Sequence, residues 1–147
     1  SFLSDIHARD HRINTKVAVS EDGDITAFEI DDWTGVGPYS VYPRTSAMEA
    51  LQVLNFTGGQ YKNRNYRGSA TVVYQNKAPM SQYRAVGHPI VTMITEGMMD
   101  DAARAIGMDP LEIRRRNLIP DEAYPTTSAS GLPFEKLSHQ ACLNKLE

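Results

Sequence analysis

The stretch HRINTKVAVSEDGDITAFEIDDW, residues 11–33, decides the fold of this chain. Apolar and polar residues alternate in both halves, which is the period of a half-buried β-strand. Between the halves, Asp22-Gly23 is a strong signal for a tight hairpin turn. The pattern therefore predicts an antiparallel hairpin over residues 11–33. The apolar residues that share a face are Ile13, Val17 and Val19 in the first half and Phe28 and Ile30 in the second.

The segments that follow predict a third strand and four helices. Glycines and prolines favour a loop over 35–43. We expect an α+β fold in which the hairpin and the third strand form an antiparallel sheet, packed against three or four helices. The expected elements are a helix over 45–55 capped by Thr45 or Ser46, a strand over 65–75, a helix from Ile90 that ends at Gly107, a helix over 110–116 capped by Asp109, and a helix from about Leu137.

Composition limits the classes of function. A chain of 147 residues that is 41% apolar can bury one core, and its net charge of −3 argues against a dedicated nucleic-acid binder. No apolar run approaches the roughly 18–20 residues of a membrane span, so no membrane partner is expected. The lone Cys142 fits a reducing compartment, which predicts a cytoplasmic location and leaves the periplasm open. Its spacing from Leu146 predicts a buried, small apolar side chain.

The two ends suggest a piece of a longer protein. The chain opens with Ser1 and closes on ACLNKLE, a helical pattern without a capping residue. We therefore expect residues 1–147 to be part of a larger domain, so the missing signal peptide says nothing about the parent protein.

Two clusters of polar residues could carry chemistry. His7 and His11 have a spacing that can hold zinc on a helix, but this stretch leads into a strand, which favours ordinary polar residues there. The run 114–116 is three arginines. It could make the chain an independent small binding module for an acidic partner, although such a run is more often a solvated helix end.

The stretch QYRAVGHP, residues 82–89, holds Arg84 in a loop directly before a helix. A helix N-terminus already carries a partial positive charge, so an arginine there is unfavourable unless an anionic group faces it. The alternative is a salt bridge between Arg84 and a surface acid. The residue pattern leaves both interpretations open.

Several motifs resemble one family. NKAPMSQYRAVGHP (76–89) and GMDPLEIRRRNLIP (107–120) are similar to blocks of the large, molybdenum-cofactor-binding subunit of the xanthine dehydrogenase / aldehyde oxidase / carbon monoxide dehydrogenase family. In the first of these blocks, Gln75 stands directly before Asn76 where the family usually has Thr. The segments beginning HARD at His7 and GGQYKNRNYRG (58–68) resemble two further blocks. Because the blocks occur in order along nearly the whole chain, the resemblance implies that residues 1–147 are a partial molybdopterin-cofactor-binding domain.

The resemblance also implies a reaction and a site. The family hydroxylates a carbon with oxygen from water, and the electrons leave through iron–sulfur clusters and FAD on partner domains or subunits. The implied cofactor is molybdopterin, plain or as its cytosine dinucleotide, and the metal needs no protein ligand. The family's general base lies outside this chain. Arg84 is implied as the catalytic residue, and the implied cofactor-binding residues are Tyr83, Arg84, Ala85, Val86 and Gly87.

Two positions narrow the substrate. Carbon monoxide dehydrogenases carry a copper-binding Cys where this chain has Ala85, and xanthine oxidases carry a stacking Phe where it has Val86. We therefore expect the parent to oxidise aldehydes or N-heterocycles. Its expected partners are the rest of the large subunit, iron–sulfur and flavin subunits and a small-molecule substrate. Residues 1–147 alone are expected to hold no cofactor, to be inactive and to self-associate through exposed apolar surface.

Overall fold

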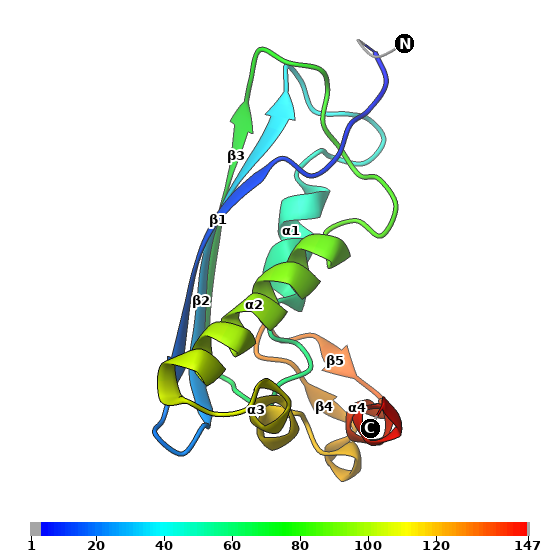
Figure 1. The fold of residues 1–147 in the computed structure, drawn as a ribbon. Helices are drawn as coiled ribbons and strands as arrows, with labels where there is room; N and C mark the ends of the chain where they lie inside the picture. The colour runs from blue at the N-terminus through cyan, green and yellow to red at the C-terminus, as the bar shows by residue number, and fades with distance from the viewer. Residues whose placement is uncertain (1–3, 147) are drawn as a thin grey trace.

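The computed structural model describes residues 4–146. A three-stranded sheet lies on one side of the molecule, helices α1 and α2 pack across it, and the C-terminal elements gather at one end (Figure 1). The predicted α+β class is confirmed. The elements are β1 (His11–Val19), β2 (Ile25–Gly37), α1 (Met48–Phe56), β3 (Tyr66–Tyr74), α2 (His88–Ile106), α3 (Pro110–Asn117), a 3-10 turn (Asp121–Ala123), β4 (Thr126–Thr127), β5 (Pro133–Phe134) and α4 (His139–Leu146).

The predicted hairpin is confirmed, since β1 and β2 pair antiparallel from His11 opposite Thr34 to Val19 opposite Ile25. Strand β2, however, continues to Gly37, so the predicted loop over 35–43 begins later than expected. The extension has a simple cause. β2 is the central strand, and Gly35 pairs with β3 on one side while its N–H donates to the carbonyl of Asp10, 2.9 Å away, on the other.

The prediction of an all-antiparallel sheet is wrong. Strand β3 runs parallel to β2, with Phe28 opposite Tyr66 and Gly37 opposite Tyr74. Helix α1 lies between these two strands in the sequence and carries the chain back to the end of the sheet where β2 began. A crossover through a helix makes the next strand parallel, whereas a tight turn makes it antiparallel. The sheet is therefore mixed, in the order β1-β2-β3.

Helices α2 and α3 end and begin where their sequence signals predict. Helix α2 starts two residues before Ile90 and stops at Gly107, whose φ is 69°. Asp109 caps α3, because its side chain accepts the N–H groups of Leu111 and Glu112 at 2.8 and 3.1 Å. These boundaries depend on local chemistry, which explains why the sequence predicts them well.

The predicted cap of α1 is wrong. The helix begins at Met48, with Ala47 as its N-cap and no side-chain cap. The hydroxyl of Ser46 instead accepts the N–H of Val41 at 3.0 Å, and that of Thr45 accepts the N–H of Ala47 at 3.3 Å. The two hydroxyls therefore stabilise the preceding turn and leave the first amides of α1 without a capping side chain.

The core lies between the sheet and helices α1 and α2. The residues of α2 that recur every four positions face it, together with Phe28, Ile30 and Val53. Helix α4 contributes no buried residue, and Cys142 on it is exposed, so the expectation of a buried cysteine is wrong. Among the described residues, no helix is both long and apolar enough to cross a membrane. The buried residues of α2 that recur every four positions are Ile90, Ile94, Met98 and Ala102.

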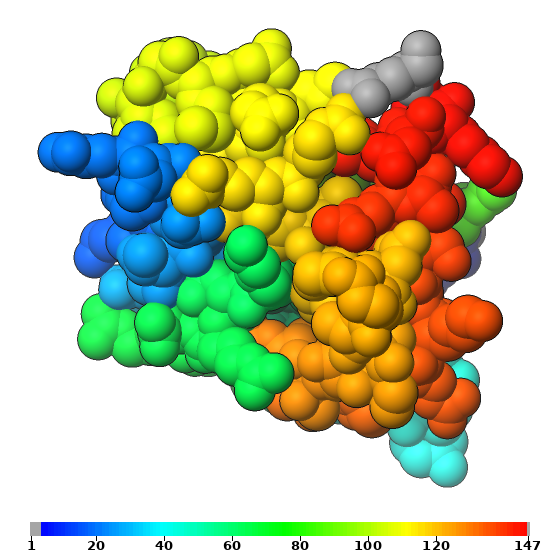
Figure 2. Space-filling view, turned by 90° about the horizontal axis from the view of Figure 1, so that it is seen from below, coloured from blue at the N-terminus to red at the C-terminus, as the bar shows by residue number. Residues whose placement is uncertain are grey.

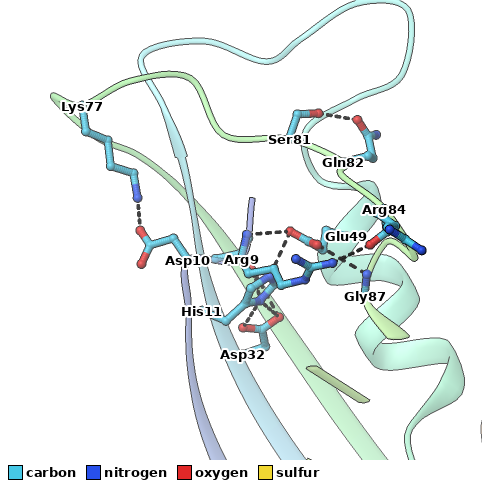
Figure 3. Close-up of polar contacts among 11 residues, drawn as sticks. Arg9, Asp10, His11, Asp32, Glu49, Lys77, Ser81, Gln82, Arg84 and Gly87 are labelled. Atoms are coloured by element: carbon cyan, nitrogen blue, oxygen red, sulfur yellow. Dashed lines mark hydrogen bonds and ion pairs between the residues drawn. The ribbon is translucent and has the colours of Figure 1, made fainter. Parts of the chain in front are cut away.

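Asn117, at the end of α3, ties this helix to the hairpin turn. Its Nδ2 donates to the carbonyls of Gly23 and Ile113 at 2.7 and 2.8 Å, and its Oδ1 accepts the N–H of Ile25 at 2.9 Å. Figure 2 shows the hairpin turn (blue) beside the α3 segment (yellow) on this face. Asn117 thereby fixes the turn end of the hairpin to α3. The opposite, open end of the hairpin lies near the loop before α2 (Figure 3).

Candidate functional site

The loop Tyr83–Gly87 forms a tight double turn immediately before α2. The N–H of Val86 donates to the carbonyl of Tyr83 at 3.0 Å, and the N–H of His88 donates to that of Ala85 at 2.9 Å. The φ angles of Ala85 and Gly87 are 67° and 72°, both in the left-handed region. A non-glycine residue there is strained and keeps this conformation only where its surroundings hold it. Tyr83, Arg84 and Ala85 are exposed, Val86 is half-buried and Gly87 is buried.

Arg84 presents an exposed guanidinium at the N-terminal end of α2. Within residues 4–146 this guanidinium has no acidic partner. The structure therefore does not support the interpretation that Arg84 makes a salt bridge to a surface acid. An exposed guanidinium without an acidic partner among these residues has the donor chemistry that binds an anionic group, and Arg84 fits the anionic end of a cofactor such as molybdopterin.

A buried ionic cluster lies beside this loop, with Glu49 between the loop and His11 (Figure 3). Nδ1 of His11 is 2.9 Å from Oδ2 of Asp32, and its Nε2 is 3.4 Å from Oε2 of Glu49. Burial alone lowers the pKa of His11, but the hydrogen bonds and charges of these two carboxylates raise it to about 9. The side chain of His11 is thus buried, at 4% exposure, and its two carboxylate neighbours favour the protonated form, so it is not a surface polar residue. The described residues contain no cluster of ligands suited to a metal ion.

Glu49, on α1, connects this cluster to the loop. Its Oε1 accepts the N–H of Gly87 at 3.4 Å, and its Oε2 accepts the N–H of Arg9 at 3.2 Å. Burial raises the pKa of Glu49, but the hydrogen bonds from His11, Arg9 and Gly87 outweigh this effect and lower it. The carboxylate therefore stays ionised at the N-terminus of α2, where a negative charge is favourable.

Arg9 contacts the loop from the other side. Its guanidinium donates to the carbonyl oxygen of Arg84 and lies 5.9 Å from the centre of the Tyr83 ring. Sequence reasoning identified neither Arg9 nor Glu49 as part of the site. One signal was available for Glu49, since it is the only charged residue in the otherwise apolar and neutral stretch 45–57.

The arginine run 114–116 is engaged within the chain. Arg114 pairs with Glu96 at 2.6 Å, and Arg116 pairs with Asp24 at 2.9 Å. Nη1 of Arg115 donates to the side chain of Asn144 at 3.0 Å. These contacts serve to join α3 to α2, to the hairpin and to α4, which leaves the idea of an acidic partner at this helix end without structural support.

Comparison with known proteins agrees with this geometry. A family model described as "Molybdopterin cofactor-binding domain" matches residues 1–118. The chain is 30% identical to the nicotine 6-hydroxylase large subunit of Paenarthrobacter nicotinovorans, across 100% of this chain and 18% of that protein. It is 35% identical to the aldehyde oxidoreductase of Megalodesulfovibrio gigas, across 78% of this chain and 12% of that protein.

The fold is also that of a solved structure. Quinoline 2-oxidoreductase from Pseudomonas putida 86 superposes with a TM-score of 0.93 at 32% identity, covering 99% of this chain and 19% of that one. The chain thus spans less than a fifth of the length of each of these three relatives. The match of the family model over most of the chain, together with these similarities, shows that the chain belongs to the molybdopterin cofactor-binding domain family.

Proposed function

We propose that this chain forms one wall of the cofactor site in the large subunit of a molybdenum hydroxylase. The observation that carries the proposal is the exposed guanidinium of Arg84 at the N-terminus of α2, which has no acidic partner among residues 4–146. In this proposal Arg84 holds the anionic end of the molybdopterin cofactor, and the neighbouring loop residues Tyr83, Ala85, Val86 and Gly87 line the same wall. When bound, the cofactor supplies a molybdenum centre that oxidises a carbon with oxygen from water.

The role proposed for Arg84 is electrostatic. Its exposed guanidinium carries a full positive charge and several N–H donors, so it can stabilise negative charge that lies against the loop. Because the loop is held in place by hydrogen bonds before any ligand arrives, little reorganisation is needed when charge develops. This arrangement makes Arg84 the residue of this chain most suited to act on the reacting groups.

The proposed substrate is an N-heteroaromatic compound. Relatives named for nicotine and quinoline match essentially the whole chain at 30% and 32% identity. The methyl group of Ala85 has no sulfur to ligate copper, and Val86 has no ring to stack on a purine. Carbon monoxide and xanthine are therefore disfavoured. An aldehyde is the second candidate, because the relative with 35% identity is named as an aldehyde oxidoreductase.

The proposed partners follow from the electron balance of the reaction. Oxidation of a carbon releases electrons, and no redox group is expected from the side chains of this domain. We propose that iron–sulfur and flavin subunits accept these electrons. Two relatives are named as subunits of larger assemblies, a nicotine 6-hydroxylase large subunit and a 6-hydroxypseudooxynicotine dehydrogenase complex subunit.

The test uses the full-length protein purified with its partner subunits. We expect molybdenum and pterin by chemical analysis, and turnover of quinoline or nicotine with an artificial electron acceptor. In isotopically labelled water the product should carry the label. The control is protein from cells grown without molybdate, which should be inactive. Absence of molybdenum, or a label that enters only from dioxygen, would overturn the proposed function. Turnover of benzaldehyde alone would replace the proposed substrate class by the second one.

A further inference from the structure

We propose that Arg9, oriented by Glu49, is a positioning residue that holds Arg84 in its working place. The two residues together are called the Arg9–Glu49 clamp. This proposal rests on the proposed function, because it assigns Arg9 a task through Arg84. The contacts that support it join three segments that are far apart in the chain: the residues before β1, the start of α1 and the loop before α2.

The loop itself has a strained backbone. Ala85 has a φ of 67°, which costs free energy for any residue with a side chain. Only two hydrogen bonds inside the loop oppose its relaxation, those from Val86 and His88 to the carbonyls of Tyr83 and Ala85. Contacts from outside the loop are therefore needed to keep Arg84 in one orientation.

Arg9 supplies such a contact at Arg84. Its guanidinium donates to the backbone carbonyl of Arg84, directly before the strained Ala85, and lies over the ring of Tyr83. A hydrogen bond from a cation is stronger than one between neutral groups. Arg9 therefore fixes the peptide plane that joins Arg84 to Ala85, and with it the direction in which the Arg84 side chain leaves the backbone.

The backbone of Arg9 is itself held in place by Glu49. Its φ is also 67°, a conformation that is unfavourable on its own, and its N–H donates to Oε2 of Glu49. The other oxygen of Glu49 accepts the N–H of Gly87. One buried carboxylate thus ties the backbone of Arg9 to Gly87, whereas the side chain of Arg9 contacts the start of the loop at Tyr83 and Arg84.

The loop also packs closely on α1. A Cβ atom added to Gly87 would lie 2.8 Å from Cβ of Gln52 and 3.1 Å from the carbonyl oxygen of Glu49. The loop is therefore pressed against the same turn of α1 that carries Glu49. Because the atoms it meets are backbone atoms of α1 and the Cβ of Gln52, none of which can swing away, this contact fixes the Gly87 end of the loop. The side chain of Arg9 holds the other end, at Tyr83 and Arg84.

The test is a double-mutant cycle in the full-length holoenzyme. Arg9→Ala should lower kcat by about tenfold, since misplacing a catalytic group by about an ångström has effects of this size or larger. In the Arg84→Ala background the same change should cost less than about twofold, because the residue it positions is gone. Arg9→Lys, which keeps the cation, should restore part of the activity. The matched control is Arg12→Ala, an exposed arginine opposite Trp33 in the sheet.

A second readout is independent of activity. Amide hydrogen exchange of Val86 and His88 in the full-length protein should be faster in Arg9→Ala than in the wild type, and unchanged in Arg12→Ala. Glu49→Gln should accelerate the exchange of Gly87, since the charge that attracts its N–H is lost. Molybdenum content should stay the same in Arg9→Ala, Arg12→Ala and Glu49→Gln.

The outcomes separate the two proposals. An equal loss of kcat from Arg9→Ala in both backgrounds, or unchanged exchange at Val86 and His88, would overturn the positioning role of Arg9. Unchanged exchange at Gly87 in Glu49→Gln would remove Glu49 from the clamp. A fall in molybdenum content that accounts for the lost activity would make Arg9 a cofactor-retaining residue instead. If Arg84→Ala itself has full activity, the proposed role of Arg84 fails, whatever the exchange data show.

Discussion

His11 on β1 and Asp32 on β2 form a buried ion pair across the hairpin, with 2.9 Å between Nδ1 and Oδ2 and side chains that are only 4% and 0% exposed. The second carboxylate of the cluster, Glu49, faces the opposite nitrogen of the ring. The two carboxylates therefore flank the imidazole ring from both of its nitrogens. Because Glu49 also accepts the N–H of Gly87, the cluster is joined by a hydrogen bond to the N-terminus of α2.

The ion pair predicts a stability that depends on pH. The pKa of His11 is raised from 6.5 to about 9, so the folded chain binds the proton more tightly than the unfolded chain. This contribution is fully present below pH 6.5 and is lost as the pH rises through about 9. Its size is on the order of 3 kcal/mol. We expect urea titrations to show a lower free energy of unfolding at the alkaline end, and His11→Gln to remove this part of the dependence. Identical pH profiles for the two proteins would contradict it.

Substitutions at two glycines distinguish the cost of steric overlap from the cost of backbone strain. Gly87 and Gly107 have φ angles of 72° and 69°, but a Cβ on Gly87 would meet α1 at 2.8 Å, whereas one on Gly107 would meet nothing within 4 Å. Gly107→Ala should lower the free energy of unfolding by about 1 kcal/mol, the cost of strain alone. Gly87→Ala should lower it by about 3 kcal/mol, because overpacking adds to the strain. Equal effects in chemical denaturation would show that the contact with α1 yields freely.

Asn117 is expected to be a principal link between α3 and the hairpin. Asn117→Ala leaves the buried N–H of Ile25 and the carbonyl of Gly23 without their partner, and each unsatisfied group costs about 1–3 kcal/mol. We expect a loss of about 3 kcal/mol in the free energy of unfolding. The matched control is Asn144→Ala on the exposed helix α4, which should change it by less than about 0.5 kcal/mol. A similar small effect at both positions would refute this assignment.

Arg84→Ala should impair catalysis and leave the fold intact. In the full-length enzyme we expect turnover to fall more than about tenfold, since loss of one positioned donor costs about 2–4 kcal/mol of barrier. The side chain is exposed, so the unfolding midpoint should not move. The control is Arg64→Ala, another exposed arginine, which lies before β3. Steady-state kinetics normalised to molybdenum content give the comparison, and full activity of Arg84→Ala would end the catalytic role proposed for it.

Features that depend on neighbouring residues could be predicted from the sequence. The alternation in β1 and β2, the stop of α2 at Gly107 and the cap of α3 by Asp109 all result from chemistry within a few positions. The position of the loop Tyr83–Gly87 before a helix could be predicted for the same reason. The cap of α1 could not, because the hydroxyls that signalled it bind elsewhere in the turn.

The tertiary structure alone decided the direction of β3 and the composition of the site. Strand direction depends on the path of the connecting chain, and the residues of a strand do not encode that path. Arg9 reaches Arg84 across 75 positions, and Glu49 reaches Gly87 across 38. No local pattern specifies such pairs, because they form only when the sheet and α1 bring their backbones together. The sequence by itself thus determined the elements and the exposed arginine, and the packing of those elements determined what holds that arginine in place.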